Sequence, residues 1–220
     1  MSLVCRFLAA LCLGLIPAAA HADDADDAAG LGFTPSAEFS LDDDTAIEVE
    51  TSVRFRSAKA GPDTYSVRLW LVQDLTDSLT IGGGIERRVN GGAAPNEIRL
   101  LQQVTGRTGV LRGRVRIEQR FIDQADQTAL RVRARVGVNV PIDAARNWRA
   151  VADVEPSLTL QPARFGGDTG LTGLRTRVGG TRRVSDRLQV GLYYLRNQEI
   201  LQGRRDRVAH APFVTLDFSF

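Results

Sequence analysis

The chain has 220 residues, with 28 Lys and Arg residues, 26 Asp and Glu residues and a formal net charge of +2. This near balance of charges argues against a nucleic-acid-binding protein, which presents a net basic face. The only two cysteines, Cys5 and Cys12, lie in a segment that we expect to be removed.

The first 22 residues predict a secretory signal peptide. Arg6 supplies a short positive region, residues 7–16 are apolar, and Ala20-His21-Ala22 fits the A-x-A cleavage pattern. An N-terminal membrane anchor is the alternative, but the apolar stretch is too short to span a bilayer as a helix. Cleavage leaves 198 residues (220 minus 22) without a thiol, and removing Arg6 lowers the net charge to +1. The mature chain is therefore expected to contain no disulfide and no cysteine-ligated metal.

Residues 23–44 are rich in Asp, with Ala and Gly between the acidic residues. This composition predicts an acidic periplasmic leader that is partly disordered. A short extra strand or plug around residues 33–41 is the alternative.

From residue 45 to the C-terminus, apolar and polar residues alternate in nearly every segment, as in strands with one apolar and one polar face. Short connections are expected at 76–78, 107–109, 141–147 and 185–187, and longer ones at 58–64, 90–96, 123–127, 162–172 and 199–206. Short turns on one side and longer loops on the other are typical of outer-membrane barrels. Residues 75–82 also resemble residues 184–191, as if one hairpin were used twice. We predict an all-β, antiparallel, up-and-down transmembrane β-barrel over residues 45–220. It has about ten strands, with twelve as the alternative count, and both termini on the periplasmic side.

The last strand is apolar at every second position and ends on an aromatic residue. It resembles the C-terminal assembly signal of bacterial outer-membrane barrels, which implies recognition by the barrel-assembly machinery. The residues that carry this signal are Val214, Leu216, Phe218 and Phe220.

Arginines occupy one face of several predicted strands. Facing lipid, each would cost about 2–4 kcal/mol near the bilayer midplane, so we expect them to line the lumen and pair with carboxylates there. The expected lumen network is Glu86, Glu97, Arg99, Arg112, Arg114, Arg116, Glu118, Arg120, Arg131, Arg133, Arg135, Arg149, Asp153, Glu155, Arg175 and Arg177. The favoured interpretation is that these charges fill and hold together a narrow barrel. The alternative is a polarised pore or a cavity that selects an anionic solute.

Four segments together resemble a known family. They are Arg114-Val-Arg-Ile-Glu118-Gln-Arg120, Leu130-Arg-Val-Arg-Ala-Arg135, Asp153-Val-Glu155 and the closing stretch His210 to Phe220. The pattern is similar to that of domain-of-unknown-function family 2490, a group of bacterial secreted proteins predicted to form outer-membrane barrels. The resemblance covers about residues 46–220, and it implies a fold and a location but no activity.

We expect no enzyme activity, no metal and no cofactor. His210 is the only histidine after residue 22, and no serine lies two residues from it, so a general base would lack a nucleophile within reach. Residues 82–84, three glycines within a strand, are expected at a close-packing or bend site. Interfacial aromatic anchors in contact with outer-membrane lipid are expected at Trp70, Phe121, Trp148, Tyr193 and Tyr194.

Two alternatives to a structural or minor solute- or lipid-handling barrel stay open. One is a soluble periplasmic β-barrel with its apolar faces turned inward around a small ligand. The other, less favoured, is an outer-membrane lipid-modifying enzyme. The sequence does not indicate an oligomeric state.

Overall fold

The computed structural model describes residues 26–57 and 63–220, so the predicted signal peptide lies outside the described residues. Within these ranges the chain is all β. The eleven strands are β1 (Asp26–Ser40), β2 (Thr45–Arg56), β3 (Thr64–Thr76), β4 (Leu79–Asn90), β5 (Glu97–Thr108), β6 (Leu111–Ile122), β7 (Ala129–Pro141), β8 (Trp148–Gln161), β9 (Gly170–Ser185), β10 (Leu188–Glu199) and β11 (Arg207–Ser219). In the described part of the chain, no helix has the length and apolar character needed to cross a membrane.

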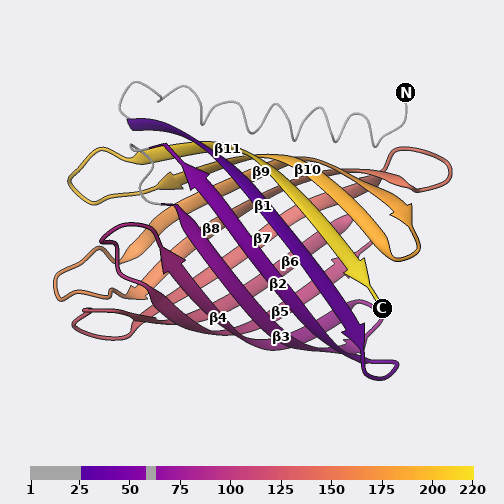
Figure 1. Ribbon diagram of the computed structural model, residues 1–220, viewed down its shortest axis with the longest axis horizontal. Helices are drawn as coiled ribbons and strands as arrows, with labels where there is room; N and C mark the ends of the chain where they lie inside the picture. The colour runs from indigo at the N-terminus through magenta and orange to yellow at the C-terminus, as the bar shows by residue number, and fades with distance from the viewer. Residues whose placement is uncertain (1–25, 58–62) are drawn as a thin grey trace.

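The strands form one closed barrel in which each strand pairs with its sequence neighbours and β1 closes on β11 (Figure 1). All pairings are antiparallel except the closing one, where β1 and β11 run parallel. The sequence predicted ten or twelve antiparallel strands, and both counts are wrong. An odd number of strands that alternate in direction can close only through one parallel pair.

The extra strand is β1, in the segment where the sequence predicted a partly disordered leader. That prediction is wrong for residues 26–40, and the alternative of a strand around residues 33–41 is closer to the structure. The pairing of β1 with β2 is interrupted, because Pro35 has no N–H to donate. Phe33 pairs with Val53, and the next paired residue of β1 is Ser36, opposite Glu50. The turn into β2 is held by Asp42, whose carboxylate accepts backbone N–H bonds from Asp44 and Thr45 at 3.0 and 2.7 Å. These bonds lower the pKa of the Asp42 carboxyl.

The two ends of the described chain lie at opposite ends of the barrel, because β1 and β11 are parallel. Asp26 is at the end that carries the longer loops, and Phe220 is at the end with the short turns (Figure 1). The prediction that both termini share the short-turn end is therefore wrong for the described chain.

The two hairpins with similar sequences also have similar turns. The backbone N–H of Ser78 donates to Thr76 Oγ1 at 3.2 Å between β3 and β4, and the N–H of Arg187 donates to Ser185 Oγ at 3.3 Å between β9 and β10. A hydroxyl that accepts the N–H two residues on is a common turn-forming device. Both turns lie at the short-turn end.

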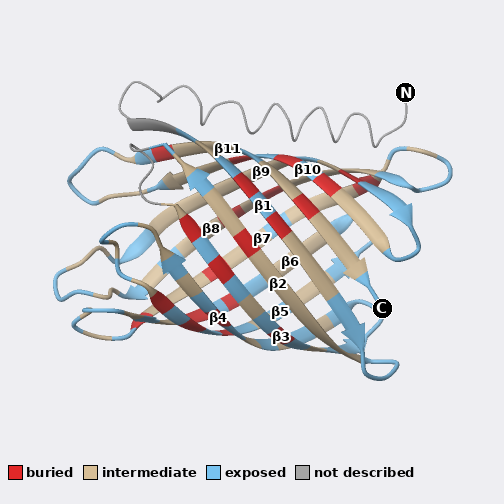
Figure 2. Cartoon of the chain, in the orientation of Figure 1, coloured by how far each residue is buried: buried red, intermediate tan, exposed pale blue. Residues whose placement is uncertain are grey.

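The barrel is polar inside and apolar outside. Fully buried side chains include Glu86, Glu118 and Glu155, whereas large apolar side chains such as Val67, Leu69 and Leu192 are exposed. Figure 2 shows buried positions along the strands, between intermediate and exposed ones. The soluble-barrel alternative required apolar faces turned inward, and the structure has the opposite arrangement.

Candidate functional site

The interior is built around five carboxylates that are almost completely covered by arginines. Exposed fractions of their side chains range from 0 to 5 %. Each strand from β4 to β8 except β7 supplies at least one of them, and they are Glu86, Glu97, Glu118, Asp153 and Glu155. A buried carboxylate is stable only when it is paired and hydrogen-bonded, so these five groups fix the positions of the guanidinium groups around them.

Glu155 has the largest set of partners. It pairs with Arg114 and Arg133, accepts a bond from Arg135 Nε at 2.8 Å, and lies 3.8 Å from Arg175 Nη1. The four arginines come from β6, β7 and β9, so one carboxylate links three strands of the wall.

A second cluster joins the wall of β2 to β5. Arg68 on β3 bridges Glu50 on β2, at 2.7 Å, to Glu86 on β4. Arg88 and Arg99 pair with the same Glu86 at 3.0 and 3.3 Å. Glu50 was among the carboxylates expected to pair with arginines in the lumen. Arg68 and Arg88 were not predicted there, although each lies on the polar face of an alternating segment, which is the signal that would have identified them.

Trp70 lies in the lumen and not at a membrane interface. It was predicted to be an interfacial anchor, but only 2 % of it is exposed, and the Arg116 guanidinium lies 4.7 Å from the centroid of its ring. Tyr193 is likewise buried, with Arg177 at 4.6 Å from its ring centroid. Both aromatics lie beside glycines, Gly84 and Gly179, which have no side chain to occupy the same space. Trp148, Tyr194 and Phe121 are exposed on the outside.

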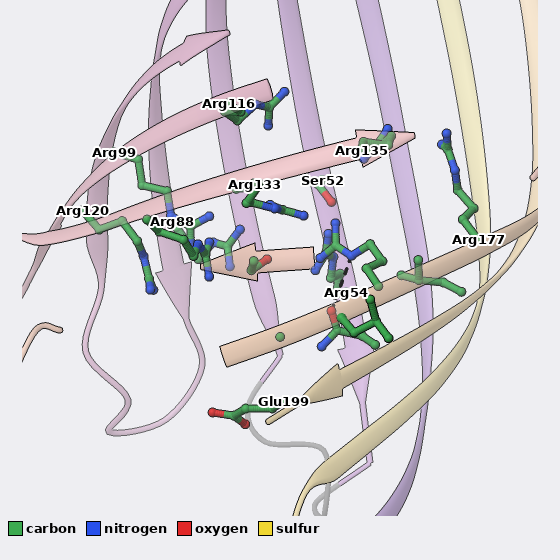
Figure 3. A pocket seen from close by; sticks show the side chains of 18 of the residues that line it. Ser52, Arg54, Arg88, Arg99, Arg116, Arg120, Arg133, Arg135, Arg177 and Glu199 are labelled. Carbon is green, nitrogen blue, oxygen red and sulfur yellow. Dashed lines mark hydrogen bonds between the residues drawn. The ribbon is translucent and has the colours of Figure 1, made fainter. Parts of the chain in front are cut away.

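A cavity of about 610 Å³ occupies the lumen. It reaches the longer loops, where Pro162, Ala163 and Asp168 and then Ile200 and Leu201 line it, and it extends inward to Glu48 and Asp217. Figure 3 shows arginines of β2, β4, β5, β6, β7 and β9 projecting into this one space.

The walls of this cavity have an excess of positive charge. Thirteen arginines line it, against five carboxylates, which are Glu48, Glu50, Asp168, Glu199 and Asp217. The five buried carboxylates that lie behind the arginines bring the number of acidic groups to ten. The thirteen arginines therefore exceed the acidic groups by three. The arginines are Arg54, Arg56, Arg68, Arg88, Arg99, Arg114, Arg116, Arg120, Arg131, Arg133, Arg135, Arg175 and Arg177.

Three residues of the predicted network lie apart from its carboxylates. Arg112 donates to the backbone carbonyls of Gly109 and Leu111, and Arg149 donates to Asn139, all at the short-turn end. Arg116 donates to Gln103 Oε1 at 2.7 Å as well as stacking on Trp70. The remaining members take part in ion pairs with one another inside the barrel, and they are Glu86, Glu97, Arg99, Arg114, Glu118, Arg120, Arg131, Arg133, Arg135, Asp153, Glu155, Arg175 and Arg177.

The C-terminal residue joins the seam of the barrel. The Phe220 ring stacks on Phe39 of β1 at 5.3 Å between centroids, and its backbone N–H donates to the Glu38 carbonyl at 2.9 Å. Phe218 stacks on Phe220 at 6.5 Å. Val214 and Leu216 lie in register with Phe33 and Pro35 of β1.

No group of three or more His, Asp or Glu side chains in the described ranges is arranged to hold a metal ion. His210 contacts the Tyr194 hydroxyl through Nδ1, and the two rings stack at 5.8 Å. This pair lies away from the charged cavity.

The fold and the interior together define a closed, all-β barrel whose described strands enclose a charged cavity. A solved structure described as the NanC porin in a rhombohedral crystal form is similar to this chain, with a TM-score of 0.51 and 9 % sequence identity. The match covers 81 % of this chain and 92 % of that one. At this identity the likeness shows the fold alone.

The family is established by sequence. The model for "Protein of unknown function (DUF2490)" matches residues 33–208, and the chain belongs to this family, as the resemblance predicted. A comparison with the curated proteins gives no match.

Proposed function

We propose that this protein is a bacterial outer-membrane β-barrel whose interior accepts a small anionic solute from the end that carries the longer loops. The observation that carries the proposal is the cavity lined by thirteen arginines and five carboxylates. A chamber with one sign of charge in excess raises the local concentration of solutes of the opposite sign. Rings of Arg and Lys are the usual selectivity device of anion pores.

The outer-membrane setting is supported by the distribution of residues over the two faces. Leucine, valine and isoleucine side chains cover the outside, and strands of 12 to 16 residues from β2 to β11 are long enough to cross the hydrocarbon layer. The expected signal peptide over residues 1–22 supports export, and the porin-like fold agrees with this location. Outer-membrane lipid and, during insertion, the barrel-assembly machinery are the partners that we infer.

The recessed carboxylates explain how so many arginines can face one cavity. Glu86, Glu118 and Glu155 lie behind the guanidinium groups and hold them by ion pairs. Each guanidinium group is therefore fixed on the side that faces the strands. The guanidinium groups remain available on the cavity side. A wall of this kind both strengthens a narrow barrel and attracts anions. A structural role for the charges and selection of an anionic solute are therefore compatible.

Two measurements test the proposal. Outer-membrane fractionation followed by electrophoresis with and without boiling should give an outer-membrane band that migrates faster unboiled; a soluble periplasmic band would contradict the location. In planar bilayers under a KCl gradient, the reversal potential should indicate anion selectivity. Cation selectivity would contradict the anionic solute, and a barrel without conductance would favour the purely structural role.

A further inference from the structure

Arg54 lines the cavity and has no carboxylate partner among the described residues. Arg56 has no ion pair there either, but its backbone N–H donates to the Asp63 carboxylate at 2.8 Å, so an acidic side chain lies close to it. Among the described residues, every cavity arginine on β3 to β9 except Arg116 pairs with a carboxylate. Arg116 stacks on Trp70 and binds Gln103. The charged groups with the strongest electrostatic effect on Arg54 are Arg88, Arg56, Arg133 and Arg68. A cation surrounded by cations in a partly buried site is destabilising unless an anion joins it.

Arg175 lines the same cavity as Arg54, from a strand that β1, β11 and β10 separate from β2. It lies on β9, and Arg54 on β2 is among the cations that repel it most strongly. Its one carboxylate contact is with Glu155 at 3.8 Å, and Glu155 is already held by Arg114, Arg133 and Arg135. Two guanidinium groups that line one cavity, both short of negative charge, are suited to hold one doubly charged oxyanion.

Three hydroxyl groups lie next to Arg54 along the wall. Thr34, Ser52 and Ser66 are aligned across β1, β2 and β3, and each is at most 9 % exposed. Thr34 Oγ1 donates to Ser52 Oγ at 2.9 Å, and all three residues line the cavity. Such a row offers both donors and acceptors to a ligand hydroxyl.

We propose that Arg54 and Arg175 form a binding site for the phosphate of a small phosphorylated polyol, whose hydroxyl groups contact Thr34, Ser52 and Ser66. The site rests on the proposed function and specifies its solute. The cavity of about 610 Å³ is in the range of small-molecule sites, roughly 300–1,000 Å³. A phosphate dianion supplies the negative charge that the two arginines lack, and the polyol occupies the hydroxyl row.

The test is isothermal titration calorimetry of the full-length mature barrel in detergent, at constant ionic strength, with inorganic phosphate, glycerol phosphate and glycerol. Glycerol phosphate should bind more tightly than inorganic phosphate, and glycerol should not bind. Arg54→Gln and Arg175→Gln should each weaken glycerol phosphate binding at least tenfold. Arg187→Gln, which removes the same charge from an exposed turn at the other end, should leave binding unchanged.

Arg54→Gln leaves no carboxylate unpaired, so the variant should fold, and its faster unboiled migration verifies this. Ser52→Ala with Ser66→Ala should abolish the advantage of glycerol phosphate over inorganic phosphate. Equal binding by wild type and Arg54→Gln would overturn the site. If wild-type barrels are still anion-selective in bilayers, the proposed function survives that result; if they are not, it fails too.

Discussion

The guanidinium of Arg116 lies 4.7 Å from the centre of the Trp70 ring, deep inside the barrel, and Gly84 is paired with Trp70 on the neighbouring strand. Trp70 also lies 5.9 Å from the Arg68 guanidinium. One aromatic ring thus contacts two cations, and together with Gln103 it holds Arg116, for which no ion pair is found among the described residues.

Replacing Trp70 by Ala should therefore destabilise the barrel. Loss of a buried Trp typically costs about 3–5 kcal/mol, and here the cation–π contact with Arg116 is lost as well. Urea unfolding followed by circular dichroism measures the free energy of unfolding. Trp148→Ala is the matched control, because Trp148 is 46 % exposed on the outer surface. Equal losses for the two variants would contradict the lumen role of Trp70.

Adjacent glycines on β4 should respond differently to substitution. A Cβ on Gly84 would lie 2.6 Å from Trp70 Cε3 and 2.7 Å from the Leu69 carbonyl oxygen, whereas a Cβ on Gly83 would meet nothing within 4 Å. Gly84→Ala should cost about 1–3 kcal/mol through overpacking, and Gly83→Ala should be close to neutral. Thermal unfolding of the two variants in parallel tests this, and a destabilised Gly83→Ala would refute it.

The carboxylate of Glu155 should be the most sensitive single charge in the lumen. Glu155→Gln leaves Arg114, Arg133 and Arg135 without their common anion, and breaking a buried ion pair costs about 3–5 kcal/mol. Glu199→Gln is the control, because Glu199 is 51 % exposed and its ion pair with Arg207 is long, at 3.6 Å. Its effect should stay within about 0.5 kcal/mol. The comparison fails if both variants unfold at the same urea concentration.

Phe220 has two separable roles, one in the folded barrel and one in assembly. Phe39→Ala and Phe220→Ala each remove the stacked pair of Phe39 and Phe220, and Phe220→Ala also removes the stacking on Phe218. Phe220→Ala should therefore reduce stability in detergent at least as much as Phe39→Ala. If Phe220 is also read by the barrel-assembly machinery, only Phe220→Ala should sharply lower the amount of folded barrel in cells. Quantifying the unboiled band from outer membranes tests this, and equal cellular yields would remove the assembly signal from Phe220.

Alternation in the sequence was sufficient to predict a barrel and to place Arg114, Arg116 and Arg133 on one face, because a strand's period of two is a local property. It was not sufficient for β1. Gly32 and Pro35 are poor strand formers, and their pairing with Phe213 and Leu216 of β11 joins residues about 180 positions apart, which no local pattern records.

The positions of Trp70 and Tyr193 were missed for a related reason. Aromatic residues near strand ends are typical of membrane interfaces, and Trp70 lies on the charged face that the sequence assigned to the lumen. What makes room for each ring is a glycine on the neighbouring strand, Gly84 for Trp70 and Gly179 for Tyr193. The register that brings each pair together is a tertiary property.

The parallel seam between β1 and β11 also limits how the chain could be rearranged. In a barrel with an even number of strands, both ends of the chain leave on the same side, and a short peptide can join them. Here a linker from Phe220 back to Asp26 would have to run beside a strand of 15 residues, roughly 50 Å at about 3.3 Å per residue. Many domains whose ends are close tolerate circular permutation with a short linker. In this barrel the linker would have to span the length of β1 instead.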